Sequence, residues 1–290
     1  MEAFFDKIIA EFAASGIENP RYELRLLLAH ILRVSPAEIN LNMSVSFDLQ
    51  DKLLPLCRQR ISHKPLDKIV GYRDFYKDTF LINEEVLSPR PDTEIIVEKT
   101  LEYLQGRPQP KILDLGTGSG CIICSLLHEK AKAKGTAVDI SASALKVAEQ
   151  NARKIGLSER IKFVAADWFE ADFPMLIADK FDVIVSNPPY IASADIATLQ
   201  PEVRDYDPHL ALDGGIDGLE SYARIIEIAP LLLNEDGWLI FESGYGQAGK
   251  IAAIGRKRGF IVCETAKDLA GIERCVIMKK DVAKINKVSI

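Results

Sequence analysis

The chain has 290 residues, of which 48% are hydrophobic and 27% charged, as expected for a globular protein of one large or two smaller domains. Its net charge of −6 argues against a dedicated nucleic-acid binder, because such proteins carry a strong basic field. The sequence has no run of about 18 apolar residues and no signal-peptide pattern. We therefore expect a cytoplasmic protein without a membrane partner.

The cysteines and histidines do not indicate a metal site. The five cysteines are scattered and odd in number, which is typical of free thiols in a reducing compartment. Cys121 and Cys124 have the spacing of a redox motif but lie in an apolar run, so we expect them to pack in the core. The four histidines lack ligand spacing, and no metal is predicted.

Residues 1–66 are predicted to form a small N-terminal helical bundle. Apolar residues recur at helical spacing over residues 20–33 and again over 47–63. Between these segments, Ser35-Pro36-Ala37-Glu38 has the pattern of a capping box with proline at the first helical position. These features favour a bundle of short amphipathic helices.

Residues 67–92 are predicted to form a β-hairpin linker. Ile69–Tyr72 and Phe75–Ile82 are rich in aromatic and β-branched residues with turn breaks between them. Ser88–Glu94 closes this region with two prolines, and Asp92 or Thr93 is suited to cap a helix over Glu94–Leu104.

Residues 93–282 alternate between strand and helix patterns. This alternation predicts an α/β domain, a doubly wound Rossmann-like sheet that binds ligands at the carboxyl ends of its strands. The last two strands lack a helix-length segment between them, so one of the two is expected to be antiparallel. The strand patterns cover Ile112–Leu115, Thr136–Asp139, Ile161–Ala165, Phe181–Ser186, Trp238–Glu242, Phe260–Cys263 and Cys275–Met278.

A glycine-rich turn follows the first of these strands. A dinucleotide fingerprint needs a sixth-position glycine, but Cys121 occupies that position, and Asp114 lies just before the turn. A carboxylate is a poor neighbour for a pyrophosphate but suits a ligand with an ammonium or hydroxyl groups. S-adenosylmethionine has both, together with a sulfonium and no phosphate. The residues predicted to contact it here are Gly116, Thr117, Gly118, Ser119 and Gly120.

Two further acidic residues lie at the ends of the next two strands. Asp139 is placed to accept hydrogen bonds from both ribose hydroxyls, and Asp167 from the adenine amino group. Trp168, beside Asp167, offers an apolar or stacking surface. Each aspartate alone could equally be a helix cap or a loop residue. Acids at three successive strand ends, with a glycine turn at the first, together favour the nucleoside site.

The fourth strand ends in Asn187-Pro188-Pro189-Tyr190. Each proline fixes its own φ and holds the preceding residue extended, so the turn is stiff. The Asn187 side-chain oxygen and the Pro188 carbonyl are then two acceptors aimed at one point, which matches a planar NH₂ group. Tyr190 is expected to stack on that plane. This geometry aligns a nitrogen lone pair with the sulfonium methyl without requiring a strong base.

Four segments form a combination of motifs. They are the N-P-P-Y stretch, Ser88–Glu94 (P-R-P-D-T-E), Asp114–Gly120 (D-L-G-T-G-S-G) and Pro208–Leu219 (P-x-x-A-L-x-G-G-x-D-G-L). Together with the N-terminal helical bundle, they resemble the HemK/PrmC family of peptide chain release factor N5-glutamine methyltransferases. The resemblance covers nearly the whole chain, although Leu66–Ile69 and Phe241–Gly244 depart from the usual family patterns.

The resemblance implies methylation of the glutamine side-chain amide in the Gly-Gly-Gln motif of class 1 release factors, with S-adenosylmethionine as donor. It implies that Asn187, Pro188, Pro189 and Tyr190 hold the amide, with Asn187 also contacting the donor. By analogy, Leu87 lines the glutamine pocket and residues 1–66 dock the release factor. We expect a monomer without a direct nucleic-acid substrate.

Other functions share parts of this pattern. The nearest alternative is the N5-glutamine methyltransferase of a ribosomal protein, and a more distant one is a DNA or RNA N-methyltransferase. A degenerate binding module or a release-factor chaperone would not need intact motifs, so the sequence favours an enzyme.

Overall fold

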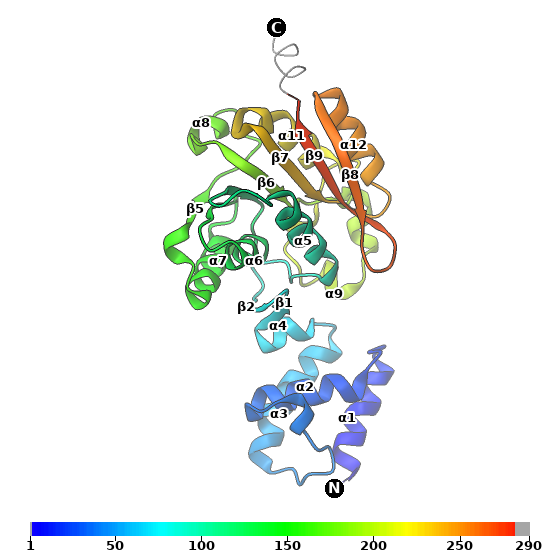
Figure 1. Cartoon of the computed structure of the whole chain (residues 1–290). Helices are drawn as coiled ribbons and strands as arrows, with labels where there is room; N and C mark the ends of the chain where they lie inside the picture. Colours follow the sequence, from blue (N-terminus) through cyan, green and yellow to red (C-terminus); the bar gives the residue numbers. More distant parts are fainter. Residues whose placement is uncertain (1, 282–290) are drawn as a thin grey trace. The chain divides into compact units, whose positions relative to one another are not determined.

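The computed structural model describes residues 2–281. The chain divides into two compact units, shown in Figure 1. The N-terminal unit comprises Met1–Tyr72 and Gln200–Tyr206, and the sheet unit comprises Arg73–Leu199 and Asp207–Ile290. Val282, the last residue of the expected methyltransferase domain, lies outside the described residues.

The N-terminal unit is helical. Its core contains fully buried residues from three helices, including Phe12, Leu24 and Leu53. Such residues recur on one face of each helix, which explains why these segments pack together although each is short. The elements are α1 (Glu2–Ala14), α2 (Pro20–Leu32), η1 (Pro36–Glu38), α3 (Phe47–Ile61) and α4 (Leu66–Val70).

Two local predictions in this unit need correction. The Ser35 capping box forms, but it encloses only the single 3₁₀ turn η1. A strand over Ile69 and Val70 is wrong, because these residues belong to α4. Pro65 precedes the helix and Gly71 ends it in the left-handed conformation (φ 84°), so the apolar pair is framed by helix boundaries.

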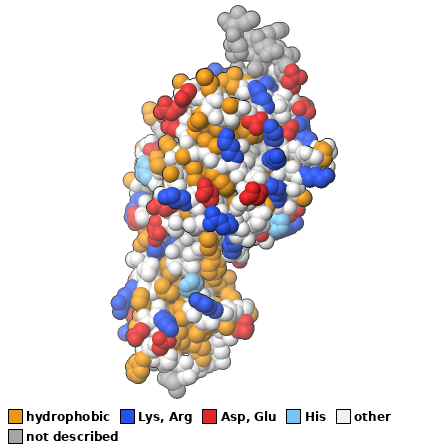
Figure 2. Space-filling model, turned by 90° about the vertical axis from the view of Figure 1, so that its left-hand side faces the viewer, with side chains coloured by type: hydrophobic (Ala, Val, Ile, Leu, Met, Phe, Trp, Pro, Cys, Tyr) orange, Lys and Arg blue, Asp and Glu red, His pale blue; other side chains and the backbone are white. Residues whose placement is uncertain are grey.

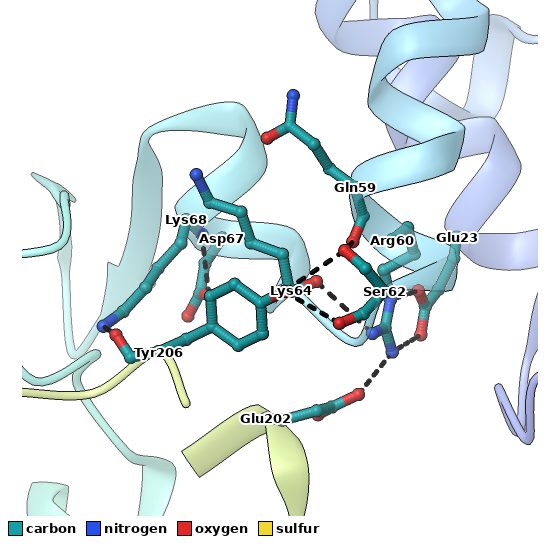
Figure 3. Close-up of polar contacts among 9 residues, drawn as sticks. All are labelled: Glu23, Gln59, Arg60, Ser62, Lys64, Asp67, Lys68, Glu202 and Tyr206. Carbon is teal, nitrogen blue, oxygen red and sulfur yellow. Dashed lines mark hydrogen bonds and ion pairs between the residues drawn. The ribbon is translucent and has the colours of Figure 1, made fainter. Parts of the chain in front are cut away.

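The N-terminal unit also contains a segment that is distant in sequence. Gln200–Tyr206, which includes α9 (Pro201–Arg204), carries Glu202 into an ion pair with the buried Arg60 at 2.7 Å. Arg60 also binds the Glu23 carboxylate (Figure 3). Two carboxylates thus compensate one buried guanidinium.

Tyr206 adds further contacts to the same unit. Its hydroxyl donates to the Ser62 carbonyl at 2.8 Å and lies 3.1 Å from the Ser62 hydroxyl. Its own carbonyl accepts a hydrogen bond from the Lys68 ammonium (Figure 3). These contacts fix Gln200–Tyr206 to the helices, although the sequence places it between two segments of the sheet unit.

The sheet unit is built on seven strands in the order β5-β4-β3-β6-β7-β9-β8. Neighbours from β5 to β7 pair in parallel, and β9 is antiparallel to both β7 and β8, which confirms the expectation of one antiparallel strand. The strands are β3 (Lys111–Leu115), β4 (Lys134–Asp139), β5 (Ile161–Ala165), β6 (Phe181–Ser186), β7 (Leu233–Glu242), β8 (Phe260–Lys267) and β9 (Glu273–Lys280).

Helices cover both faces of this sheet, so the predicted Rossmann-like fold is confirmed. One apolar cluster packs under α5 (Glu94–Tyr103), α6 (Cys121–Glu129) and α7 (Ala142–Ile155). The other packs under α8 (Phe173–Ile177), α11 (Glu220–Leu232) and α12 (Ala248–Lys257). The parallel strands β3–β7 therefore present all their carboxyl ends at one edge.

Shorter elements complete the described chain. The predicted hairpin consists of β1 (Tyr72–Phe75) and β2 (Asp78–Leu81), which form their own two-stranded sheet. The remaining elements are η2 (Pro91–Thr93), η3 (Ser158–Arg160), η4 (Ser193–Thr198) and α10 (His209–Leu212). Within the described part of the chain, no helix combines the length and apolar character of a membrane span.

Candidate active site

A cavity in the sheet unit opens at the carboxyl ends of β3, β4 and β6. It brings together eight of the residues that the sequence singled out. These are Gly116, Thr117, Gly118, Ser119, Asp139, Trp168, Asn187 and Pro189. Leu87, expected at the glutamine pocket, also lines it. Four predicted residues do not line it, namely Gly120, Asp167, Pro188 and Tyr190.

The glycine turn shapes one wall of this cavity. The backbone amides of Gly116 and Thr117 both donate to the Val138 carbonyl, at 2.9 and 3.0 Å, which ties the turn to β4. Gly120 has a φ of 78°, and a Cβ there would lie 3.0 Å from the Cβ of Ala148. Only glycine lets the turn pass so close to α7 and start α6 at the cavity.

Asp114 lies beneath the turn and is fully buried. Its Oδ2 accepts a hydrogen bond from the Thr117 hydroxyl at 2.7 Å. Burial, with a smaller contribution from the nearby Asp139 carboxylate, raises the pKa of Asp114 to about 7 against the opposing effect of the Thr117 hydroxyl. In this structure Asp114 supports the turn from below and does not line the cavity.

Asp139 faces the cavity at the end of β4. One carboxylate oxygen accepts from the Gly118 amide at 2.9 Å, and the other accepts from the Ser141 amide at 2.9 Å. Burial raises its pKa against these amides. Each oxygen has a further lone pair, so the carboxylate is held in place and can still accept from two neighbouring hydroxyls.

Trp168 lies close to the glycine turn and gives the cavity an apolar surface. A Cβ added at Gly116 would lie 3.5 Å from the Trp168 ring, an ordinary van der Waals contact, so the ring packs next to the turn. Arg224 Nε donates to the Trp168 carbonyl at 2.9 Å and holds this segment. The Asp167 carboxylate accepts from the Phe169 amide at 2.8 Å, so its adenine-binding role stays a prediction.

These features fit S-adenosylmethionine. Asp139 offers a fixed acceptor pair for a ribose diol, and Trp168 lies where a flat base needs an apolar surface. The glycine turn brings the backbone close to the ligand without side chains in the way. The residues that would hold the donor are Gly116–Ser119, Asp139 and Trp168.

The Asn187–Tyr190 turn is clamped from several sides. Ser186, just before it, donates its hydroxyl proton to the Leu115 carbonyl at 2.6 Å. The Tyr190 carbonyl accepts from Gln247 Nε2 at 2.9 Å. Gly218 has a φ of 72°, and a Cβ there would lie 2.3 Å from the Tyr190 oxygen. The glycines in Pro208–Leu219 thus allow that segment to press against the turn.

Burial also surrounds the Tyr190 side chain. The pKa of its phenol is raised to about 12, first by burial and then by the Glu242 carboxyl. Tyr190 therefore stays neutral and packs against the apolar cluster of α11 and α12. Its stacking role on the substrate amide stays a prediction.

Two residues at this site were missed by reasoning from the sequence. Glu242 ends β7 and is buried at 3% exposure. Thr93 is equally buried, and the prediction that it caps α5 is wrong, because its side chain makes no capping hydrogen bond. The 3₁₀ turn η2 leads directly into the helix, and the Thr93 hydroxyl interacts with Glu242 instead. An acid ending an apolar strand, as at Asp114 and Asp139, was the available signal for Glu242.

Comparison with family models identifies both parts of the chain. A model described as "Methyltransferase domain" matches residues 107–287, and one described as "PrmC N-terminal domain" matches residues 4–71. The second match ends one residue before the division of the compact units at Tyr72.

Curated relatives span nearly the same length. A release factor glutamine methyltransferase of Rhodospirillum rubrum is 42% identical over 93% of this chain and 82% of its own. Proteins of the same name from Geobacter sulfurreducens and Agrobacterium fabrum are 40% and 38% identical. These matches cover 91% of both chains for the first protein, and 92% of this chain and 93% of the relative for the second.

Solved structures support the fold alone. The catalytic domain of hMettl16, in complex with an RNA hairpin, has a TM-score of 0.55 and 19% identity over 83% of this chain and 86% of its own. A methyltransferase from Pyrococcus furiosus has a TM-score of 0.51 and 19% identity over 81% of this chain and 99% of its own.

Proposed function

The chain belongs to the family of release factor glutamine methyltransferases, and from this premise we propose that it methylates N5 of a glutamine in class 1 peptide chain release factors. The enzyme is a protein-glutamine N-methyltransferase that uses S-adenosylmethionine as methyl donor. We further propose that the modified glutamine is that of the Gly-Gly-Gln motif.

One observation carries this function within the structure. Asn187 and Pro189 line the same cavity as the glycine turn and Asp139. The turn that suits a planar amide therefore adjoins the residues that suit a nucleoside. This adjacency supports the proposal of methyl transfer to an amide nitrogen.

The chain's residues contribute positioning more than proton transfer. When bound, S-adenosylmethionine would supply a methyl group activated by its positively charged sulfur, which would leave as a neutral thioether while one amide proton passes to solvent. We propose that the Asn187 side-chain oxygen and the Pro188 carbonyl accept from the two amide N–H groups. Held in this way, the nitrogen needs no strong base, because its proton becomes acidic as the new bond forms.

The remaining assignments are proposals about partners and place. Residues 1–66 would dock the release factor, with Leu87 and Tyr190 beside the substrate amide. We propose that the enzyme is a cytoplasmic monomer without a membrane partner or a direct nucleic-acid substrate. Relatives named for release factors support the proposed protein partner, and the net charge of −6 supports the proposal that nucleic acid is not a direct substrate.

A transfer assay tests the proposal. The protein is incubated with methyl-labelled S-adenosylmethionine and, separately, a purified release factor, ribosomal proteins and DNA. We expect label on the release factor and none when its Gly-Gly-Gln glutamine is replaced by alanine. Label on nucleic acid, on ribosomal protein alone, or on no substrate would overturn the proposed function.

A further inference from the structure

Glu242 and Asn187 are neighbours at the carboxyl edge of the sheet. The parallel strands β6 and β7 pair with Ser186 opposite Phe241, so the residues that follow on the two strands, Asn187 and Glu242, are neighbours. Side chains alternate between faces along a strand. Val185 and Ile240 both belong to the cluster under α5 and α6, so Asn187 and Glu242 leave the sheet toward that same face.

Hydrogen-bonding side chains from two other elements surround the Glu242 carboxyl. The Thr93 hydroxyl and the Asn187 carboxamide both lower its pKa and so favour its charged form. Its Oε2 is buried without a hydrogen bond of normal geometry among residues 2–281. Asn187 lines the cavity, whereas Glu242 lies behind it. Thr93 and Asn187 both line the cavity, so Glu242 acts on the cavity through these two side chains, and Asn187 is the one that is proposed to bind the substrate amide.

A carboxamide has two faces that differ in chemistry, an oxygen that accepts and an NH₂ group that donates. A carboxylate accepts only, so it binds the NH₂ end of Asn187 and turns the Asn187 oxygen away from itself. The substrate amide requires an acceptor on the cavity side. With no acceptor behind it, the Asn187 group could rotate and present its own NH₂ group to the substrate NH₂ group.

We propose that Glu242 is a positioning residue that fixes the orientation of the Asn187 carboxamide, with Thr93 holding the Glu242 carboxyl in place. This role rests on the proposed function, because it concerns how the site receives a planar amide. Glu242 would then be part of the site without touching either the donor or the substrate.

The protonation state of Glu242 decides whether this device works. Burial raises its pKa to about 7, opposed by Thr93, Arg274 and Asn187. A protonated carboxyl can donate to the Asn187 oxygen and no longer selects one orientation. Methyl transfer should therefore fall as the pH drops below about 7. The other titratable or charged groups facing Glu242 are Asp92, Cys121, Tyr190, Tyr222, Arg274 and Cys275.

A conservative variant separates this role from simple packing. Glu242→Gln keeps the shape and one acceptor oxygen but cannot ionise. We expect its turnover on the release factor at pH 8.5 to fall about tenfold, an effect comparable to losing one hydrogen bond to a charged group. Its affinity for S-adenosylmethionine should stay at the wild-type value. The acid limb of turnover against pH, present in the wild type, should be absent.

Matched variants control for local structure. Ser243→Ala, at the adjacent buried position, should keep both the turnover and the acid limb. Thr93→Val removes the hydroxyl that holds Glu242 and should reduce turnover, whereas Thr93→Ser should restore it. Equal turnover and an unchanged acid limb in Glu242→Gln would overturn the inference.

A second measurement does not depend on methyl transfer. The ¹⁵N resonance of the Asn187 side-chain amide, assigned with Asn187→Asp, is followed against pH in the ligand-free wild type. We expect it to titrate with a midpoint near 7 and to lose this step in Glu242→Gln. A resonance that does not titrate rejects the Asn187–Glu242 pairing. Failure of the release-factor assay with the titration intact rejects only the proposed function.

Discussion

Two buried carboxyls lie near the carboxyl edge of the sheet, with Glu242 two residues further along its strand than Asp114. Asp114 lies near the end of β3 and Glu242 ends β7, and burial raises the pKa of each to about 7. Each also interacts with a threonine hydroxyl, Thr117 for Asp114 and Thr93 for Glu242. They differ in where their partners lie in the chain, which is local for Asp114 and distant for Glu242.

Asp114 is held by the turn that immediately follows its own strand, so its effect stays with the donor-binding wall. Glu242 is held by residues from two remote segments, and one of them is the proposed substrate ligand Asn187. The difference separates the site into a donor half (Gly116–Gly120, Asp139 and Trp168) and an amide half (Asn187–Tyr190 with Glu242). Changes in the first half should alter donor affinity, and changes in the second should alter turnover.

The largest expected effect lies in the amide half. Asn187→Ala removes one of the two acceptors for the substrate amide, and turnover should fall about 100-fold, as for other losses of alignment at a reacting atom. Donor affinity, measured by isothermal titration calorimetry, should change little. Asn234→Ala, at the opposite end of β7, is the matched control and should keep normal turnover. If Asn187→Ala kept turnover near the wild-type value, Asn187 would not be an acceptor that the substrate amide needs.

The donor half should respond in affinity. Asp139→Asn keeps the side-chain shape but loses the charge, and a hydrogen bond to a charged group contributes about 1.5–3 kcal/mol. The dissociation constant for S-adenosylmethionine should therefore rise about 10- to 100-fold, with turnover at saturating donor much less affected. Asp179→Asn is the control, because among residues 2–281 the Asp179 carboxylate binds the exposed Lys111 and the backbone amide of Lys180, away from the cavity. If Asp139→Asn lost turnover but kept the wild-type affinity for S-adenosylmethionine, the division of the site into a donor half and an amide half would be wrong.

Gly218→Ala tests whether the clamp on the Asn187–Tyr190 turn matters. The new methyl group would meet the Tyr190 carbonyl and displace the turn, so turnover should fall about tenfold at unchanged donor affinity. Gly246→Ala is a close control, because Gly246 has a similar φ of 73° but no atom within 4 Å of the added Cβ. If Gly246→Ala lost as much turnover as Gly218→Ala, backbone strain, and not the contact with the Tyr190 carbonyl, would be the cause of the loss.

The smallest expected effect concerns stability. Asp114 has a pKa of about 7 in the folded protein and about 3.9 when unfolded. Between these values the folded state binds the extra proton, so the contribution of Asp114 to stability is complete below pH 4 and is lost as the pH rises through 7. In Asp114→Asn, the melting temperature of the ligand-free protein should decline less between pH 4.5 and 7.5 than in the wild type. If the melting temperatures of the variant and the wild type changed equally with pH over this range, Asp114 would not have the raised pKa in the folded protein.

Sequence periodicity accounted for most of the sheet unit but not for every boundary. β5 and β6 lie where the sequence placed them. β6 is a buried central strand, for which a short apolar run is typical, whereas β5 is an edge strand that is only partly buried. Ile69 and Val70 form a helix because Pro65 and Gly71 frame them, and β-branched composition is a weaker signal than these boundaries. β7 begins earlier than expected, at Leu233, with an irregular register that a simple run does not reveal.

At the site, the predicted residues that line the cavity were found from their neighbours in sequence. The glycine turn and Trp168 come after strands and Asp139 ends one, and the ends of parallel strands meet at one edge in any such sheet. Glu242 was passed over because its partners, Thr93 and Asn187, are far from it in the chain. Thr93 was assigned to a helix cap for the same reason, since the sequence shows its neighbours and not its contacts.

The sequence by itself determined the alternation of strands and helices, the glycine turn before α6 and the stiff Asn187–Tyr190 turn, because each depends on residues within a few positions of one another. Only the tertiary structure decided that Gln200–Tyr206 joins the N-terminal helices and that Glu242 stands behind Asn187. Both depend on pairings across long connections, through an ion pair at Arg60 and through the register of β6 and β7. Such pairings are selected by the packing of the whole chain, and no local pattern of residues specifies them.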